Sequence, residues 1–178
     1  MNESKISVRY AKAMLEHARE ENKLGQAKDD MIFIGRCIRE VPEFILLLET
    51  PVVRTAEKKK IIEKAIGDQI TPLTLSFVNL VFNQKRESFL ESISRHFLYL
   101  YNKEMGISPA LLITAEKVDP DIRKNIVDVI SQKLKTNIDL VEQTDEKIKG
   151  GFVMRIEDHQ IDASIASRLA KIRKELIY

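Results

Sequence analysis

LYLYNKEMGISPALLITAEKV, residues 98–118, contains a change in the spacing of apolar residues. Up to Gly106 the apolar residues recur every three or four positions, as on the buried face of a helix. After Gly106, short runs alternate between apolar and polar residues, which is the period of a strand with one buried face. This change of period predicts two domains, residues 1–105 and residues 106–178.

Residues 1–105 have the pattern of a six-helix bundle with short loops. Pro42 suits the first turn of a short helix, and Thr55 and Gly67 suit the start and the end of the next one. Thr71 followed by Pro72 is another start signal. The expected helices cover about residues 5–21, 27–40, a short segment from Pro42 that carries Phe44, Leu47 and Leu48, then 55–67, 71–83 and 86–105.

Residues 106–178 have the pattern of a small βαββα domain, so the chain is expected to be an α+β protein. Asp119 and Pro120 predict the start of a helix that ends near residue 134, and Asp162 is expected to cap a last helix. Strands are expected at residues 110–118, 138–143 and 151–156, with a turn at 157–160. Each helix carries one apolar face: Ile122, Ile126, Val129, Ile130 and Leu134 on the first, and Ile165, Leu169, Ile172 and Leu176 on the last.

The composition excludes several classes of function. The 178 residues include 29 basic and 27 acidic side chains, and this net charge of +2 is too balanced for a protein that binds nucleic acid over a broad face. The apolar runs, such as residues 44–48, are far shorter than the roughly 20 residues that cross a bilayer. The first residues show no signal-peptide core, and the single cysteine fits a reducing compartment, so we expect a protein that stays inside the cell.

The sequence contains no pattern that predicts a metal site or a nucleotide site. His17, His96 and His159 are far apart, no two of them lie at i and i+4, and the sequence has no second cysteine. The pair Gly150-Gly151 precedes a strand pattern rather than Lys and a helix, so we interpret it as a turn.

Catalysis is not predicted either. Ser164, His159 and Asp158 are the residue types of a catalytic triad, but no strand-to-helix elbow presents the serine. The basic run at residues 58–60 is interpreted as a solvated helix face rather than a nucleic-acid patch. We therefore expect no catalytic residue, no cofactor and no metal.

The first and fifth expected helices carry more apolar surface than a bundle helix requires. Their polar residues form only a narrow strip, whereas about 100° of apolar arc is enough to cover a core. Two explanations are open. Both helices are central in the bundle, or their outer faces line a groove for a partner's amphipathic helix, which the small side chains of Ala11 and Ala13 would let approach closely.

Four segments of the sequence are similar to segments of one known family. They are RYAKAM (residues 9–14), LLLETPVV (46–53), FVNLVFNQKRESFLESI (77–93) and GGFVMRIEDHQIDASIASRLAKIRKEL (150–176). Together they resemble the delta subunit of bacterial F-type ATP synthases, the counterpart of the mitochondrial oligomycin sensitivity-conferring protein. The last segment is the most specific, because its double glycine, strand, Ile-Asp turn and terminal helix follow the family order.

The resemblance implies a non-catalytic stator subunit. In that family, the N-terminal domain binds the catalytic head of alpha and beta subunits through the alpha N-terminal segments, and the C-terminal domain holds the b subunits of the peripheral stalk. The head then does not turn with the rotor, so proton-driven rotation is coupled to ATP synthesis. The implied location is the cytoplasmic face of the cell inner membrane, reached only through the complex, with no nucleic acid as partner. An RNA-associated adapter and a small enzyme with an unrecognised site are the alternatives.

The resemblance also implies two binding regions, and the first lies between the first and fifth helices. The positions that match this head-binding groove are Tyr10, Ala13, Met14, His17, Phe77, Leu80, Val81 and Gln84. The region expected to support binding of the stalk contains Gly150, Gly151, Phe152, Ile161, Asp162 and Arg168. We expect a positive φ at one or both of the glycines.

Overall fold

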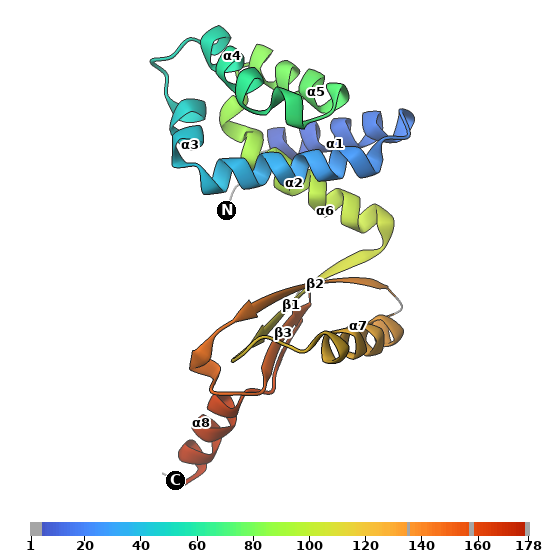
Figure 1. The fold of residues 1–178 in the computed structure, drawn as a ribbon, viewed down its shortest axis with the longest axis vertical. Helices are drawn as coiled ribbons and strands as arrows, with labels where there is room; N and C mark the ends of the chain where they lie inside the picture. The colour runs from blue at the N-terminus through green and yellow to red at the C-terminus, as the bar shows by residue number, and fades with distance from the viewer. Residues whose placement is uncertain (1–4, 135, 157–158, 177–178) are drawn as a thin grey trace. The chain divides into compact units, whose positions relative to one another are not determined.

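The computed structural model describes residues 5–134, 136–156 and 159–176, and the chain divides into two compact units, Met1–Tyr101 and Asn102–Tyr178. The first unit is helical, and the second is built on a four-stranded sheet (Figure 1). The predicted α+β class is therefore confirmed.

The first unit packs its helices around one hydrophobic core, whose largest fully buried side chains include Met14, Met31, Phe82 and Phe97. The helix α5 begins at the predicted signal, because Thr71 Oγ1 accepts a hydrogen bond from the Thr74 N–H and Pro72 is the first helical residue. The α-helices are α1 (Lys5–Glu20), α2 (Leu24–Glu40), α3 (Pro42–Glu49), α4 (Thr55–Ile66), α5 (Pro72–Asn83) and α6 (Leu90–Met105), with the 3₁₀ turns η1 (Gly67–Gln69) and η2 (Glu87–Phe89).

The signals predicted for the ends of α4 are only partly correct. Thr55 is the first helical residue, and Arg54 takes the N-cap position without a capping side-chain bond. Gly67 does follow the last residue of α4, but its φ of −59° is helical because the chain continues into η1 instead of reversing direction.

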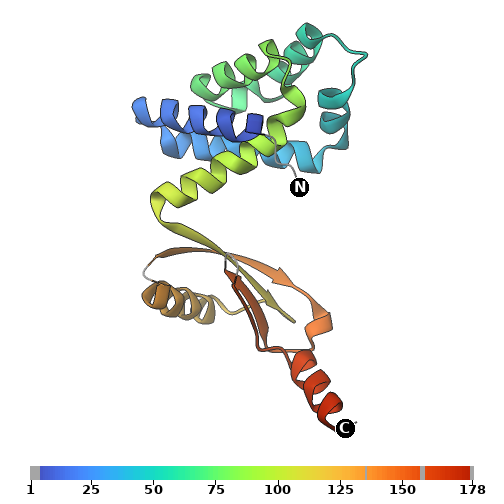
Figure 2. The ribbon, with the colours of Figure 1, turned by 180° about the vertical axis from the view of Figure 1, so that it is seen from behind.

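The second unit contains a sheet with the strand order β2-β1-β3-β4. β1 and β2 are parallel, with Ile107 opposite Asn137, and α7 forms the crossover between them; β3 is antiparallel to both β1 and β4. The helix α7 lies alongside the sheet (Figures 1 and 2). Its Ile126, Val127 and Ile130 pack on the apolar core of the sheet. The elements are β1 (Ile107–Thr114), α7 (Pro120–Leu134), β2 (Asn137–Thr144), η3 (Glu146–Ile148), β3 (Phe152–Ile156), β4 (His159–Asp162) and α8 (Ile165–Leu176).

The predicted βαββα order is wrong by one strand, because His159–Asp162 forms β4 and the described order is βαβββα. Ile161 of β4 lies opposite Met154 of β3. All four residues of β4 are exposed, so no alternation of buried and exposed positions marks the strand in the sequence. Residues 157–158 of the predicted turn lie outside the described residues.

Candidate protein-binding sites

Tyr10 of α1 and Phe77 of α5 bring two of the predicted head-binding residues into contact. Their ring centroids are 6.4 Å apart and their planes meet at 66°, which is an edge-to-face pair. Phe77 is buried and Tyr10 is half-buried. The pair places α1 alongside α5 at this point (Figures 1 and 2).

An exposed strip extends along each helix from this pair. Ala13 and His17 lie three and seven positions after Tyr10, and Leu80 and Gln84 lie at the same spacings after Phe77, so each set shares one helix face. All four are exposed, and Leu80 exposes 48% of its surface. We call this site the α1–α5 surface, and its residues are Tyr10, Ala13, His17, Phe77, Leu80 and Gln84.

Met14 and Val81, also predicted in the groove, lie in the core instead. They expose 1% and 0% of their surface, so neither is accessible to a partner in this fold. Leu73, Val78 and Phe82 are buried as well, which means that most of the wide apolar arc of α5 faces the core. The central position of α5 therefore explains most of its apolar surface, and Leu80 is the large apolar side chain that it leaves exposed.

The sequence predicts that Lys58 lies on a solvated helix face, and this is wrong. Lys58 forms a buried ion pair. Its Nζ donates hydrogen bonds to the Leu48 carbonyl oxygen at 2.9 Å and to Glu87 Oε1 at 3.1 Å, and the two charged side chains are only 5% and 9% exposed. Within the described residues, Glu87 Oε2 has no hydrogen-bond partner. The pair joins the end of α3, the first turn of α4 and η2, which suits a structural role.

An apolar groove of about 410 Å³ lies between α7 and strands β3 and β4. It contains two of the predicted stalk-region residues, Phe152 and Ile161, which are 36% and 55% exposed. The α7 side of this groove is not among the residues that the sequence predicts for binding. The spacing of apolar residues predicts an apolar face on α7, but it does not indicate whether the rest of the protein buries that face. The lining residues are Ile122, Asn125, Ile126, Val129, Ile130, Lys133, Phe152, Met154 and Ile161, and we call this site the α7–sheet groove.

The glycine pair before β3 has a conformation that requires glycine, as predicted. Gly150 and Gly151 have φ values of +135° and +73°. A Cβ on Gly151 would lie 2.4 Å from the Ala163 carbonyl oxygen, which is a fixed backbone atom. A Cβ on Gly150 would lie 2.9 Å from the end of the Ile165 side chain. The close approach lets the Ile165 N–H donate to the Gly150 carbonyl oxygen, which ties the start of α8 to the sheet.

Ser164, not Asp162, occupies the N-cap position of α8. The buried Ser164 Oγ accepts a hydrogen bond from the Ser167 N–H at 3.2 Å. Asp162 supports this turn from two residues earlier, because its carboxylate accepts bonds from the Ser164 N–H at 2.9 Å and the Ser167 hydroxyl at 2.6 Å. The bond from the Ser167 hydroxyl has the largest effect and the bond from the Ser164 N–H the next, and both lower the pKa of the exposed Asp162 carboxyl.

The helix α8 leads away from the sheet (Figure 1). Its apolar stripe is exposed. Ile165, Leu169 and Ile172 expose about half of their surface, and Arg168 beside them is exposed as well. The side chain of Leu176, predicted on the same stripe, lies outside the described residues. A stripe of this kind is typical of a helix that packs against a partner.

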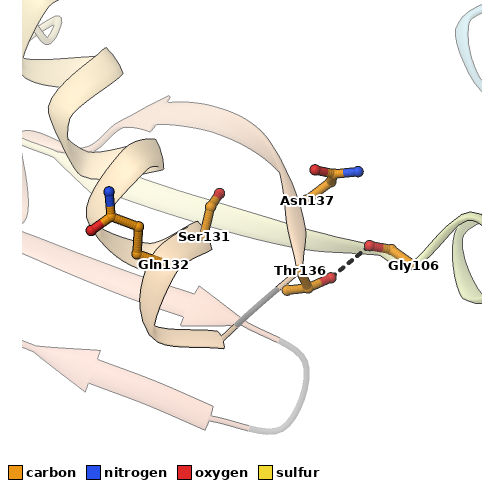
Figure 3. A pocket seen from close by; sticks show the side chains of 5 residues that line it. All are labelled: Gly106, Ser131, Gln132, Thr136 and Asn137. Atoms are coloured by element: carbon orange, nitrogen blue, oxygen red, sulfur yellow. Dashed lines mark hydrogen bonds between the residues drawn. The ribbon is translucent and has the colours of Figure 1, made fainter.

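A polar depression lies where β1 and β2 begin (Figure 3). Thr136 Oγ1 and the Asn137 N–H both donate to the Gly106 carbonyl oxygen, at 2.6 and 3.2 Å. Ser131 and Gln132 of α7 complete its lining. The bonds fix Gly106 to the start of β2, so we interpret the depression as part of the fold.

Two of the three residue types of a catalytic triad fall within the described residues. Ser164 holds α8, His159 is exposed on β4, and Asp158 lies outside the described residues. Within the part of the chain that the structure describes, no group of metal-ligating side chains is found, and no helix is long and apolar enough to cross a membrane.

Comparison with known proteins identifies the family. The family model of the ATP synthase delta (OSCP) subunit matches residues 6–176, and the chain belongs to this family. ATP synthase subunit delta of Cytophaga hutchinsonii is 30% identical over 98% of this chain and 96% of that protein. The corresponding subunit of Bacteroides fragilis is 33% identical over 97% of this chain and 94% of that protein.

A solved structure supports the same fold. A chain of the mitochondrial ATP synthase hexamer of Toxoplasma gondii, determined by cryo-electron microscopy, matches with a TM-score of 0.74 and 20% identity, over 98% of this chain and 99% of that one. The predicted resemblance is confirmed. The chain is a structural stator subunit of the F-type ATP synthase. ATP synthesis and ion transport are functions of that complex, to which the chain belongs.

Proposed function

We propose that residues 1–105 bind the catalytic head and residues 106–178 bind the peripheral stalk, so that this non-catalytic chain couples proton-driven rotation to ATP synthesis. The observation that carries the proposal is that each unit has a hydrophobic core of its own and an exposed apolar surface of its own. The complex holds the chain at the cytoplasmic face of the cell inner membrane, and the chain contacts the membrane only indirectly.

The α1–α5 surface is the proposed contact with the N-terminal segments of the alpha subunits, beside the beta subunits. Leu80 offers an exposed apolar side chain, and Ala13 lets a helix approach α1 closely. The Tyr10–Phe77 pair holds the two helices at a fixed separation beneath such a helix. These features suit the apolar face of one amphipathic helix.

The α7–sheet groove and the α8 stripe are the proposed contacts with the b subunits. The groove is lined almost entirely by apolar side chains, so a helix with an apolar stripe would fill it without burying an unpaired charge. Ile165, Leu169 and Ile172 offer a second apolar stripe, which Arg168 flanks with a positive charge. Two stalk helices would thereby each have an apolar contact.

Two single substitutions in the full chain test whether the sites are separate. Loss of an apolar anchor from a desolvated contact costs about 2 kcal/mol, or roughly a thirtyfold loss of affinity. Leu80→Asp should therefore weaken binding to a head purified without this subunit and leave b-subunit binding unchanged. Phe152→Asp should do the reverse. Leu46→Asp, at a 67% exposed position on α3, is the control and should change neither affinity. Normal binding by both folded variants would contradict the proposal.

A further inference from the structure

The exposed apolar stripe of α8 is narrow. With about 100° between successive helical residues, Leu169 lies about 40° to one side of Ile165 and Ile172 about 20° to the other, so these large apolar residues span about 60°. A helix that covers the core of a globular protein carries about 100° of apolar arc. The narrower stripe, with alternating steps of four and three residues, is the seam of a coiled coil. The spacing therefore indicates contact with a single partner helix.

An arginine flanks this seam on each side. In the heptad notation of coiled coils, Ile165 and Ile172 take position d and Leu169 takes position a. Arg168 is then at position g and Arg173 at position e, and each lies about 70° from the middle of the stripe, on opposite sides. Both arginines are exposed. Residues at e and g form ion pairs with the partner helix and thereby select the partner and its orientation.

The net charge of α8 is positive. From Ala163 to Arg173 the sequence contains three cations and no carboxylate, and the two residues that follow are one lysine and one glutamate. The turn η3, which α8 contacts, carries one glutamate and one lysine, so it adds no net charge. The carboxylate of Asp162, just before the helix, is bound to the Ser164 N–H and the Ser167 hydroxyl. The uncompensated cations favour a partner with carboxylates beside its apolar stripe.

A second copy of α8 does not fit this pattern. If two copies of α8 paired along the seam, the residues at e and g of one helix would face those of the other. Within Ile165–Arg173 those charged residues are Arg168 and Arg173, so like charges would meet in either relative direction. Like-charge contacts are a means by which an interface rejects a wrong partner. The flanking arginines therefore disfavour pairing between copies and favour an acidic helix.

We infer that α8 forms a two-stranded coiled coil with a helix of a b subunit, and that this helix carries carboxylates on both sides of its apolar stripe. The carboxylates on one side pair with Arg168, and those on the other side pair with Arg173. The inference rests on the proposed function, because it gives the chemistry of the partner at the α8 contact proposed there.

Charge reversal in the full chain tests the ion pairs. Arg168→Glu and Arg173→Glu should each weaken binding of a soluble b-subunit segment about fivefold at low salt, and the loss should shrink at high salt because ions screen exposed charges. Lys171→Glu makes the same change on the exposed side of α8, about 130° from the middle of the stripe, and should bind as the wild type does. If the wild type does not bind the b segment, the proposed function fails together with the inference. If the wild type binds and both arginine variants match Lys171→Glu, the inference alone fails.

A photo-crosslink followed by a charge swap tests the partner residue. The full chain with p-benzoylphenylalanine in place of Arg173 is mixed with the b segment and irradiated, and the linked peptide is sequenced. The expected peptide has apolar residues at coiled-coil spacing and an Asp or Glu beside the link. Replacement of that carboxylate by Arg should restore the affinity lost in Arg173→Glu, which a merely structural role of the arginine would not allow.

Three results of these experiments would overturn the inference. They are a link to a second copy of this chain, a linked peptide without a carboxylate, and no recovery of affinity in the charge swap. Vesicles of phosphatidylserine probe a membrane surface as the alternative source of negative charge. Tighter binding of the full chain to these vesicles than to the b segment, lost in Arg168→Glu and Arg173→Glu, would assign α8 to a membrane surface instead.

Discussion

Replacement of Lys58 by Met tests whether the buried ion pair stabilises the helical unit. The substitution leaves the Glu87 carboxylate buried without its cation and removes the donor to the Leu48 carbonyl oxygen. Removal of one partner from a buried ion pair costs about 3–5 kcal/mol. A domain of this size is stable by only about 5–15 kcal/mol, so the helical unit should lose about a fifth or more of its stability.

Urea unfolding of the full chain, followed by the helical circular dichroism signal, measures this loss. Lys60→Met removes an exposed cation from the same helix and should change the free energy of unfolding by less than about 0.5 kcal/mol. The double variant Lys58→Met/Glu87→Leu should recover most of the loss, because an apolar pair of similar volume replaces the buried charges. The reasoning is refuted if Lys58→Met matches Lys60→Met, or if the double variant is no more stable than Lys58→Met.

Three further predictions concern the second unit and the division of the chain. Gly151→Val should destabilise the second unit by about 2 kcal/mol or more, because of its positive φ and the close Ala163 carbonyl, whereas Gly25→Ala, with open space around it, should be nearly neutral in the same urea unfolding. Because the pKa of Asp162 is lowered, its carboxylate stabilises the fold at pH values above the ordinary pKa of 3.8, and this contribution is lost as the pH falls through the lowered pKa. The free energy of unfolding of Asp162→Asn should therefore depend less on pH below about 4 than that of the wild type. An equal dependence on pH in the two proteins would count against the hydrogen bonds. A fragment of residues 1–105 should be folded and mostly helical by circular dichroism, and an unfolded fragment would contradict an independent helical unit.

Periodicity predicts the helices well because burial of one face fixes the spacing of apolar residues. The segments 5–21, 71–83 and 86–105 carry apolar residues at helical spacing, and the structure forms α1, α5 and α6 there, packed on one core. Lys58 could not be placed in this way. A lysine in a basic run reads as solvent-exposed, and its partner Glu87 is remote in sequence and is brought close only by the tertiary fold.

The candidate sites were predicted less completely than the helices. Ser164 and Asp162 are both good capping residues, so the start of α8 could not be fixed from residue type alone. The exposed stripe of α8 and the α7 wall of the groove have the same apolar spacing as a buried face, and only the packing distinguishes the two. Met14 and Val81 match the head-binding groove of the family by position, but both side chains are buried in this fold.

The central claim is that one chain bridges the head and the stalk through separate units. Native mass spectrometry of the full chain mixed with a head that lacks this subunit and with a soluble segment of the b subunits measures this directly. The account predicts a complex that contains all three, and it predicts that deletion of residues 107–178 removes the b segment while the head remains bound. Retention of the b segment after that deletion, or competition between the head and the b segment for the full chain, would contradict the account.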